Sequence, residues 1–249
     1  MKAIINADDL GISIVVNDAI FELMAKGRVT SATVMANGAA LEDAAMRAKQ
    51  FPQCSFGVHL NASEFRPITS GLGLRTILDD SGCFAGNRLR EIKITSELRE
   101  ALFGEWSAQV ERVQAAGFRV SHFDSHHHMH TVPGVFPVLK RLQRKFGMRK
   151  VRITLNIYLN SAPAPLPRWL AKVVWNFCLR NYFQTKTTDG FASLEIFAKA
   201  AAELKGNFRS VELMVHPGGE SFTEETKMLA GEWWRGLPVA IEPISYNEL

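Results

Sequence analysis

Cysteine is scarce in this sequence, with three residues among 249: Cys54, Cys83 and Cys178. Their number is odd, they lie far apart, and no two of them have the Cys-x-x-Cys spacing. This usage argues against a disulfide framework and is typical of a reducing compartment. We therefore expect a cytoplasmic protein.

Long apolar runs are absent as well. No segment approaches the roughly 20 consecutive apolar residues that a membrane-spanning helix needs. Near the amino terminus, the acidic residues Asp8 and Asp9 occur before the apolar core of a signal peptide can form. On these grounds we expect no membrane partner.

Neither sign of charge dominates. The sequence has 29 Lys and Arg against 25 Asp and Glu, a formal net charge of +4, and no long basic run interleaved with aromatic residues. The most basic stretch, Lys140 to Lys150, includes Leu142, Phe146 and Met148, which predicts the solvated face of an amphipathic helix. Nucleic acid is therefore not expected as a partner.

What the sequence does contain is 47% hydrophobic residues, arranged in short β-like runs that alternate with longer helical ones. A chain of this length can bury a full core, and the alternation favours a parallel α/β fold. Strands are predicted at Lys2–Ala7, Ser31–Ala36, Ser55–Leu60, Arg119–Asp124, Lys150–Thr154, Ser210–His216 and Pro238–Ile244.

The helical segments have apolar residues at steps of three or four. Helices are predicted at Val16–Lys26, Leu41–Gln50, Ser96–Ala116, Val135–Phe146, Leu166–Phe183, Ser193–Lys205 and Glu224–Trp233. In the longest, the residues expected to face the core are Leu98, Leu102, Trp106, Val110 and Val113. No break in composition indicates a linker, so residues 1–249 are predicted to form one domain. Ser70–Asn87 and Asn156–Pro167 are predicted to be its long loops.

Histidine is concentrated in one place. Five of the seven histidines lie between His122 and His130. Imidazole is a common ligand of divalent metals, and each buried ring needs a partner for its nitrogen atoms. The density of the cluster therefore favours a metal site over the alternative, a solvated polar loop.

Other polar residues occur where predicted strands end. These residues are Asp8, Asp9, His59, Asp124 and His216, and Arg152 lies within the fifth predicted strand. Groups at the carboxyl ends of parallel strands meet at one edge of a sheet, where α/β barrels carry their catalytic residues. Each residue also has a structural alternative: Asp can cap a helix, His59 can be a satisfied core residue, and His216 can open a turn.

The motifs resemble those of one family. Asn6-Ala7-Asp8-Asp9-Leu10-Gly11, Val29-Thr30-Ser31, Gly57-Val58-His59-Leu60, the segment His122–His130 and Val215-His216-Pro217-Gly218 occur in the order found in the YdjC-like carbohydrate deacetylases, the group that contains chitooligosaccharide deacetylase. The resemblance is weakest in Ser63–Asn87 and Asn156–Thr188. It implies a single-domain (β/α) barrel, seven-stranded or distorted, with a metal site at the carboxyl ends of the strands.

The resemblance also implies roles for individual residues. Asp9, His59 and His126 would hold one divalent ion, Asp8 would be the general base, and His216 the general acid or oxyanion stabiliser. Arg152 would orient Asp8. The implied reaction is hydrolysis of the N-acetyl group of a small N-acetylglucosamine-containing saccharide. Leu10 and Asn61 replace the phenylalanine and threonine that are common in the family, which leaves the ligands intact but alters the pocket wall.

Several alternatives stay open at this level. Two imidazoles favour zinc, whereas a carboxylate with waters would accept magnesium. The same residues could serve another metallohydrolase, such as a two-ion phosphoesterase, or a carbohydrate-binding barrel without activity. Trp169 and Trp175 on one predicted helix are explained either by a homodimer surface or by core packing.

Overall fold

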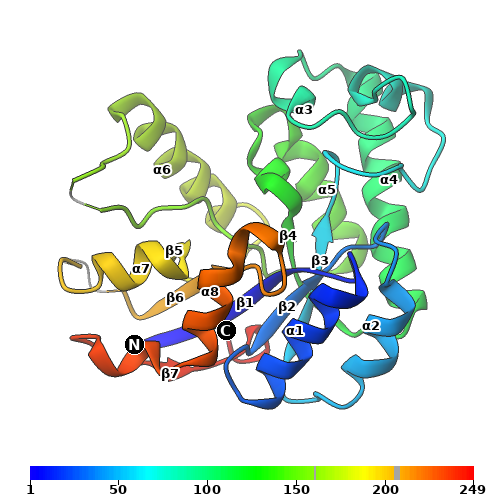
Figure 1. Cartoon of the computed structure of the whole chain (residues 1–249). Helices are drawn as coiled ribbons and strands as arrows, with labels where there is room; N and C mark the ends of the chain where they lie inside the picture. The colour runs from blue at the N-terminus through cyan, green and yellow to red at the C-terminus, as the bar shows by residue number, and fades with distance from the viewer. Residues whose placement is uncertain (160, 205–207) are drawn as a thin grey trace.

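The protein is an α/β structure built on a parallel sheet (Figure 1). The computed structural model describes residues 1–159, 161–204 and 208–249. The strands within this part of the chain are β1 (Lys2–Leu10), β2 (Ser31–Val34), β3 (Ser55–Leu60), β4 (Val120–Ser125), β5 (Gly190–Ser193), β6 (Ser210–Val215) and β7 (Glu242–Pro243). Every pairing between these strands is parallel, which confirms the predicted fold class.

The sheet has the order β4-β3-β2-β1-β6-β5, and β7 pairs with the start of β1. An extended segment after α5 lies between the two outer strands: the amide of Phe123 in β4 donates to the Lys150 carbonyl at 3.0 Å, and the amide of Asn156 donates to the Phe191 carbonyl in β5 at 3.2 Å. Because this segment contacts both outer strands, it bridges the open side of the sheet and gives a distorted barrel, as predicted.

The helices surround the sheet in Figure 1. They are α1 (Ile14–Ala25), α2 (Leu41–Ala48), α3 (Arg88–Glu91), α4 (Ser96–Ala115), α5 (Phe136–Phe146), α6 (Leu166–Asn181), α7 (Leu194–Ala200) and α8 (Thr223–Ala230). The hydroxyl groups of Ser13 and Thr95 accept hydrogen bonds from amides in the first turns of α1 and α4, and so begin these two helices. All five residues of α4 that the periodicity assigned to the core are buried.

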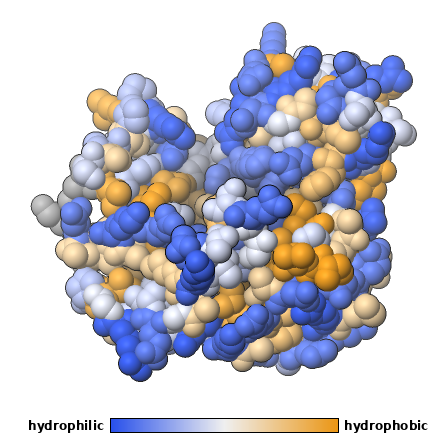
Figure 2. All heavy atoms as spheres, in the orientation of Figure 1, coloured by the Kyte–Doolittle hydropathy of each residue, from blue (hydrophilic) through white to orange (hydrophobic). Residues whose placement is uncertain are grey.

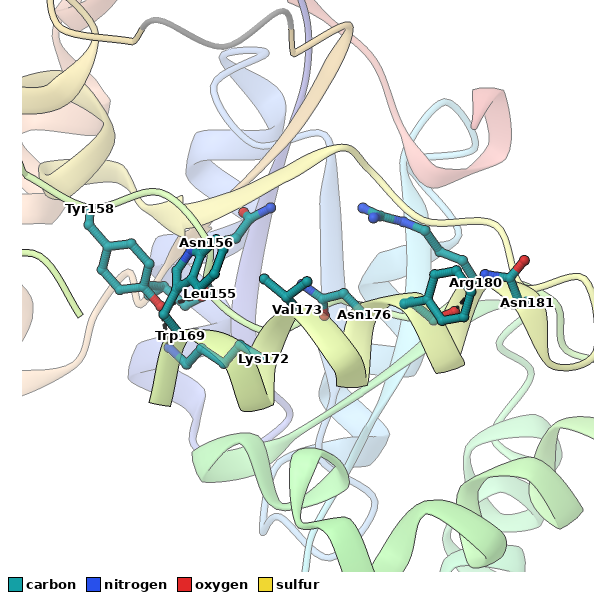
Figure 3. Close-up of a pocket in the computed structure, with 10 residues that line it drawn as sticks. Leu155, Asn156, Tyr158, Trp169, Lys172, Val173, Asn176, Arg180 and Asn181 are labelled. Carbon is teal, nitrogen blue, oxygen red and sulfur yellow. Dashed lines mark hydrogen bonds between the residues drawn. The ribbon is translucent and has the colours of Figure 1, made fainter. Parts of the chain in front are cut away.

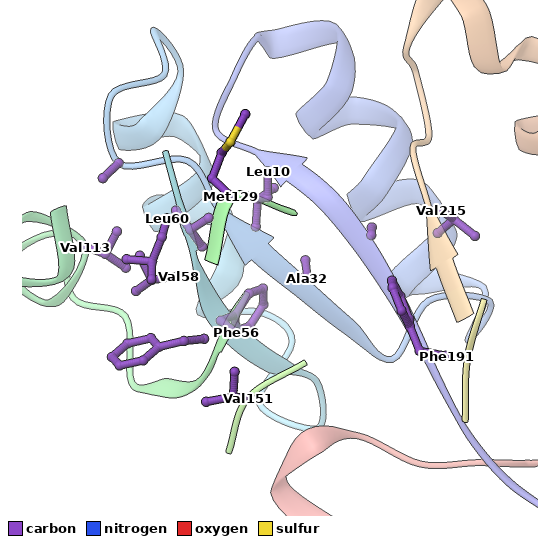
Figure 4. Close-up of a cluster of buried hydrophobic side chains, with 14 of the residues drawn as sticks. Leu10, Ala32, Phe56, Val58, Leu60, Val113, Met129, Val151, Phe191 and Val215 are labelled. Carbon is purple, nitrogen blue, oxygen red and sulfur yellow. The ribbon is translucent and has the colours of Figure 1, made fainter. Parts of the chain in front are cut away.

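The core lies between the sheet and the helices (Figure 4). β2 and β3 are buried along their full length, because parallel strands are covered on both faces. Phe56 and Val58 of β3 pack in the same cluster as Val113 of α4 and Met129 of the histidine segment. Each such side chain stabilises the fold by roughly 1.5–3 kcal/mol relative to an exposed position. The histidine segment is therefore anchored to the core.

Two of the predicted strands are wrong in their extent. Lys150–Thr154 forms only isolated bridges at Lys150 and Val151, because it bridges two strands instead of running along one. Pro238–Ile244 is reduced to the two residues of β7. Strand β5 was not predicted, since its four residues are too few for an alternating pattern.

The predicted helices agree with the structure to within a few residues at their ends. The exception is the helix predicted at Ser193–Lys205, because α7 ends at Ala200; Lys205 lies outside the described residues.

The interpretation of the basic stretch Lys140 to Lys150 as a solvated helix face is wrong for Lys140, because its ammonium group is buried. It donates to the carbonyl oxygens of Leu179 and Tyr182 at 3.0 and 2.8 Å.

Candidate metal centre

The acidic pair at the end of β1 is placed by an irregularity in the strand. Adjacent residues of a regular strand point to opposite faces, which would separate Asp8 from Asp9. Here the register of β1 against β2 shifts between Ala7 and Leu10, and Asp9 has a φ of 68°. This bulge turns Asp9 toward the same edge of the sheet as Asp8, so both carboxylates reach one site.

Strands β3 and β4 supply the next contact. His59 and Asp124 are direct neighbours in the parallel register, and Asp124 Oδ1 lies 2.7 Å from His59 Nδ1. Thr33 of β2 donates to the other oxygen of Asp124 at 3.0 Å. The contact with Asp124 occupies Nδ1 and leaves Nε2 of His59 facing Asp9, at 3.3 Å from Asp9 Oδ1. An imidazole braced by a carboxylate in this way is typical of metal-binding histidines.

His126 directly follows β4 and begins a 3-10 helix, His126–Thr131. The next two residues, His127 and His128, have positive φ values of 50° and 54°, a strained conformation for residues with a side chain. His126 Nδ1 lies 2.9 Å from Asp9 Oδ1, and its Nε2 lies 3.2 Å from Glu64 Oε2. His126 therefore lies at the edge of the sheet directly after β4, and the chain turns sharply behind it.

Asp9, His59 and His126 consequently form a compact cluster. One ligand atom from each residue lies within 4.8 Å of the other two. Oδ1 of Asp9 is buried and has no hydrogen-bond partner with suitable geometry in the described part of the chain, and the same is true of Nε2 of His126. Buried polar atoms without partners are uncommon, and a cation would satisfy the Asp9 oxygen. The donor set of two imidazoles and one carboxylate fits a divalent metal, zinc in particular.

The charge balance of the site also fits a cation. Arg152 is fully buried and bound to three carboxylates: Asp8 through two hydrogen bonds of 2.6 and 2.7 Å, Asp124 at 2.7 Å and Glu212 at 2.8 Å. Asp9 is a fourth buried acid of the site without a contact to Arg152, and burial raises the pKa of the Glu212 carboxyl to about 7. Buried carboxylates in such excess require protons or a further positive charge.

The pKa values of the two acids at the end of β1 reflect their neighbours. Burial opposes ionisation of Asp8, but the Arg152 guanidinium outweighs it and holds the pKa of this carboxyl well below its usual range. Burial likewise opposes ionisation of Asp9, and the rings of His126 and His59 lower its pKa well below the usual range. Both carboxyl groups are therefore ionised at neutral pH.

His216 lies beside this cluster, one residue after β6. Its Nε2 is 3.9 Å from Asp8 Oδ2, and its ring stacks on Phe222 with centroids 4.3 Å apart. Its backbone amide donates to Glu225 of α8, and burial raises the pKa of the Glu225 carboxyl to about 7. Burial also lowers the pKa of the His216 ring, so the imidazole is neutral at neutral pH. All six sequence-predicted site residues thus meet at one edge of the sheet.

Within the described part of the chain, two further sets of side chains come close enough to hold an ion. Asp8, His59 and Asp124 form the first, but Arg152 already binds both of its carboxylates, which makes it a poor cation site. The second consists of Glu64, His126 and His127. It lies at the surface, with Glu64 and His127 about half exposed, and it shares His126 with the cluster around Asp9.

Two acidic residues of the site, Glu212 and Glu64, were not identified from the sequence. Glu212 accepts hydrogen bonds from Arg152 and from the Tyr246 hydroxyl, at 2.8 and 2.6 Å. A signal for Glu212 existed, because a charged residue within the apolar strand Val211–Val215 must have a buried partner. Glu64 gave no comparable signal. Its position depends on Asn61, whose side chain hydrogen-bonds the backbone of residue 64.

The remaining histidines of the cluster have structural contacts. His122 stacks on Tyr246 with ring centroids 3.5 Å apart, and His130 contacts Ser125 and the Arg152 carbonyl. His128 differs, because it lines a cavity of about 630 Å³ next to the site. Burial lowers the pKa of His128 to about 3, so its ring is neutral there.

This cavity lies in the hollow between α6 and the part of the molecule that carries α3, α4 and α5 (Figure 2). Besides His128 it is lined by the cations Arg90, Arg168 and Lys172 and by Trp175. A second cavity, of about 360 Å³, lies on another flank of α6, where Figure 3 shows Trp169 and Lys172 opposite Tyr158. His128 is the residue of the histidine segment that lines the first cavity, and none of Asp9, His59 and His126 lines either one.

Fold and site together define an α/β barrel with acids and histidines at the carboxyl ends of its strands. Residues 2–236 match the family described as YdjC-like protein, so the chain belongs to the YdjC-like family. This confirms the resemblance found in the sequence.

Relatives with the name carbohydrate deacetylase cover most of the chain. The protein of Vibrio cholerae serotype O1 is 32% identical over 87% of this chain and 78% of its own length. That of Geobacillus stearothermophilus is 33% identical over 86% and 78%. A crystal structure from Enterococcus faecalis V583, whose description assigns it provisionally to cellobiose-phosphate cleavage, is similar in fold: the TM-score is 0.76 at 23% identity, over 99% of this chain and 98% of that one.

Proposed function

We propose that this protein is a metal-dependent hydrolase that removes N-acetyl groups from small N-acetylglucosamine-containing saccharides. The observation that carries the proposal is the cluster of Asp9, His59 and His126, with Asp8 and His216 directly beside it. The names of the relatives support deacetylation of carbohydrates. Two imidazoles and one carboxylate make zinc the preferred ion over magnesium.

In the proposed mechanism Asp9, His59 and His126 would hold the divalent ion. Once bound, such an ion lowers the pKa of water from 15.7 to about 7 and polarises the acetyl carbonyl. Asp124 keeps the His59 ring in the orientation that presents Nε2. Arg152 holds both oxygens of Asp8 and keeps this carboxylate ionised. The ionised Asp8 is thereby placed to accept a proton as the general base.

His216 completes the proton path. Its Nε2 lies 3.9 Å from Asp8, and its neutral ring is free to take up the proton that Asp8 accepts. The resulting imidazolium donates to the nitrogen of the departing amine and stabilises negative charge on the reacting carbonyl. Phe222 fixes the plane of the ring by stacking.

An acetate-release assay tests the proposal. N-acetylated mono-, di- and trisaccharides are offered to the chain with zinc or magnesium, before and after chelation. We expect turnover that chelation abolishes and metal restores. His126→Ala should lose metal and activity, whereas the matched neighbour His127→Ala should keep both. Turnover that is insensitive to chelation would refute the mechanism.

A two-ion phosphoesterase is the second candidate, and the set Glu64, His126 and His127 is the observation that favours it. In that case His127→Ala should remove one of two bound ions and reduce phosphatase activity. Metal analysis separates the candidates, since the deacetylase needs one ion per chain. A chain that binds saccharide but releases no acetate would instead be a binding barrel.

The cellular setting belongs to this proposal as well. Cys54, Cys83 and Cys178 are unpaired, which supports the cytoplasm as the compartment. Among the described residues, no helix combines the length and the apolarity needed to cross a bilayer. Of the two tryptophans considered for a dimer surface, Trp175 is buried in the core and Trp169 is 45% exposed. A homodimer remains a prediction.

A further inference from the structure

The imidazole ring of His216 lies between two carboxylates. Its Nε2 is 3.9 Å from Asp8 Oδ2, and its Nδ1 is 3.9 Å from Glu225 Oε1. Nδ1 is buried and has no hydrogen-bond partner with suitable geometry in the described part of the chain. Such atoms are uncommon in folded proteins. The side of the ring that faces Glu225 therefore has a function still to be assigned.

Glu225 is an acid in a buried position without a basic partner. It is 4% exposed, and its Oε1 accepts a hydrogen bond of 2.5 Å from the His216 amide. Within the described part of the chain its one ion-pair contact is with the His216 ring, while Asp8 of β1 and Glu195 of α7 place further negative charge near it. Burial raises the pKa of its carboxyl to about 7. A glutamine could accept the same hydrogen bond without this cost, and a buried acid with a raised pKa is typical of functional sites.

The start of α8 fixes the position of the ring beside Glu225. Phe222, directly before the helix, stacks on the His216 ring, and Thr226 Oγ1 accepts from the Gly218 amide at 3.3 Å. Gly218 has a φ of 77°, and a Cβ atom added to it would lie 2.9 Å from a carbonyl oxygen of α1. The segment after β6 is thus held at its ring, at its amide and at the turn that follows. Glu225 and Nδ1 are therefore fixed neighbours.

The proton path proposed above requires one tautomer of this ring. A neutral imidazole has its proton on one nitrogen, and only the other nitrogen accepts a proton. Nε2 faces Asp8, so it must be the acceptor, and the resident proton must lie on Nδ1. A carboxylate beside Nδ1 favours this tautomer, and its charge then stabilises the imidazolium. The separation of 3.9 Å is no obstacle, since hydrogen bonds between catalytic groups often shorten only in the reacting complex.

We propose that Glu225 is a positioning residue for His216, which holds the ring with its proton on Nδ1, keeps Nε2 available to the proton on Asp8 and compensates the charge of the imidazolium. This inference rests on the proposed function, because it acts through the role that His216 has there. It assigns Glu225 no contact with the metal ion. Metal affinity and substrate binding should therefore not depend on Glu225.

Glu225→Gln tests the proposal, because it removes the charge and keeps an acceptor for the His216 amide. At about pH 8 we expect kcat for acetate release to fall about 10- to 100-fold, the usual effect of losing a hydrogen bond to a charged group. KM and the dissociation constant of zinc should stay unchanged. Glu224→Gln is the matched control, since Glu224 is exposed on the same helix and should behave like the original chain.

The pH profile of kcat separates this role from a structural one. In the original chain kcat should rise with pH through about 7, as Glu225 becomes ionised. This rise should be absent from Glu225→Gln, and the two profiles should approach each other as the pH falls below about 6. The other charged groups that influence Glu225 or the His216 ring are intact in both chains: Asp8, Asp9, His59, Arg152 and Glu195.

A double-mutant cycle shows whether Glu225 acts through the ring. His216→Ala should lower kcat, and adding Glu225→Gln to that variant should change kcat by less than about twofold. Nitrogen-15 NMR of the histidine rings at about pH 8 gives a measurement that does not need activity. We expect the His216 proton on Nδ1 in the original chain, and a larger fraction on Nε2 in Glu225→Gln.

The proposal is overturned if Glu225→Gln keeps the kcat and the pH profile of the original chain. It is also overturned if the substitution has the same effect with and without His216, or if the NMR spectra show the proton on Nε2 in the original chain. A chain that releases no acetate from any saccharide would refute the proposed function instead, and the NMR result would still decide whether Glu225 sets the tautomer. Denaturant titration at about pH 8 should find Glu225→Gln at least as stable as the original chain, which excludes unfolding as the cause of lost turnover.

Discussion

Residue by residue, the candidate centre is ordered by charge and hydrogen bonding. Arg152 binds Asp8, Asp124 and Glu212 at once, and Asp124 in turn holds His59. A change in one of these side chains therefore acts on the others, and single substitutions in this network are not expected to be additive. The role of the proposed base Asp8 can be tested by a substitution that removes its charge and keeps the shape of its side chain.

Replacing Asp8 by Asn keeps the volume of the side chain and removes its charge. We expect turnover to fall by about 10²- to 10⁴-fold, the usual contribution of a general base, while one metal ion per chain is retained. Acetate release and metal analysis measure the two effects separately. Activity close to that of the original chain would show that Asp8 is not the base.

Glu225 determines a pH dependence of stability. Its folded-state pKa is about 7, above the ordinary value of 4.5, because the carboxyl is buried. The folded state therefore binds this proton more tightly, and Glu225 costs stability as the pH rises from about 4.5 to about 7. The full cost above pH 7 is on the order of 3 kcal/mol. Glu225→Gln can still accept the hydrogen bond from the His216 amide.

We therefore expect Glu225→Gln to raise the free energy of unfolding by up to that amount at about pH 8, and by much less at about pH 5. Denaturant titrations at both pH values measure the difference. Glu224→Gln is the control, because Glu224 precedes it on α8 and is exposed. Equal effects of Glu225→Gln at the two pH values would contradict the prediction.

Among the elements, β3 shows how packing behind the site restricts the sequence. Gly57 lies two residues before His59, and a Cβ atom added to it would lie 2.5 Å from the His122 ring. That ring is stacked on Tyr246, whose hydroxyl binds Glu212. The close approach of β3 to this stack thus requires a residue without a side chain.

Gly57→Ala should reduce the free energy of unfolding by about 1–3 kcal/mol, since the buried stack must shift to accept the methyl group. Gly104→Ala is the control: no atom lies within 4 Å of the added Cβ on α4, and alanine should stabilise this helix by about 0.5–1 kcal/mol. Thermal and denaturant unfolding test both variants. An unchanged free energy of unfolding in Gly57→Ala would contradict the prediction, because it would mean that the stack of His122 on Tyr246 accepts the methyl group without cost.

At the scale of the whole molecule, four strands and the loops that follow them are joined through one site. A divalent ion bound by Asp9, His59 and His126 would connect the ends of β1, β3 and β4. An ion that binds only the folded chain stabilises it by about 2.7 kcal/mol at one hundred times its dissociation constant.

Zinc at that concentration should raise the melting temperature by roughly 5–10 °C, given about 2–4 °C per kcal/mol for a chain of this size. A chelator should reverse the shift, and His126→Ala should show none. Differential scanning calorimetry provides the measurement. An unchanged melting temperature with zinc would contradict the proposed ligand set.

The sequence alone determined the parallel α/β class, the core face of α4 and the motifs that carry Asp8, Asp9, His59, His126 and His216. These are properties of local pattern, since apolar periodicity and short motifs are written along the chain. The irregular parts were not determined in this way. The bridging segment after α5, the four-residue strand β5 and the position of Glu64 depend on contacts between distant residues.

Only the tertiary structure decided how the motifs act together. The bulge in β1 brings Asp8 and Asp9 to the same side, and Arg152 meets Glu212 and Asp124 from three separate elements. The orientation of α6 is fixed in the same way, by the burial of Trp175 and Leu179 on the side that packs against α5. Such outcomes follow from which surfaces pack together, and packing is a property of the folded chain as a whole.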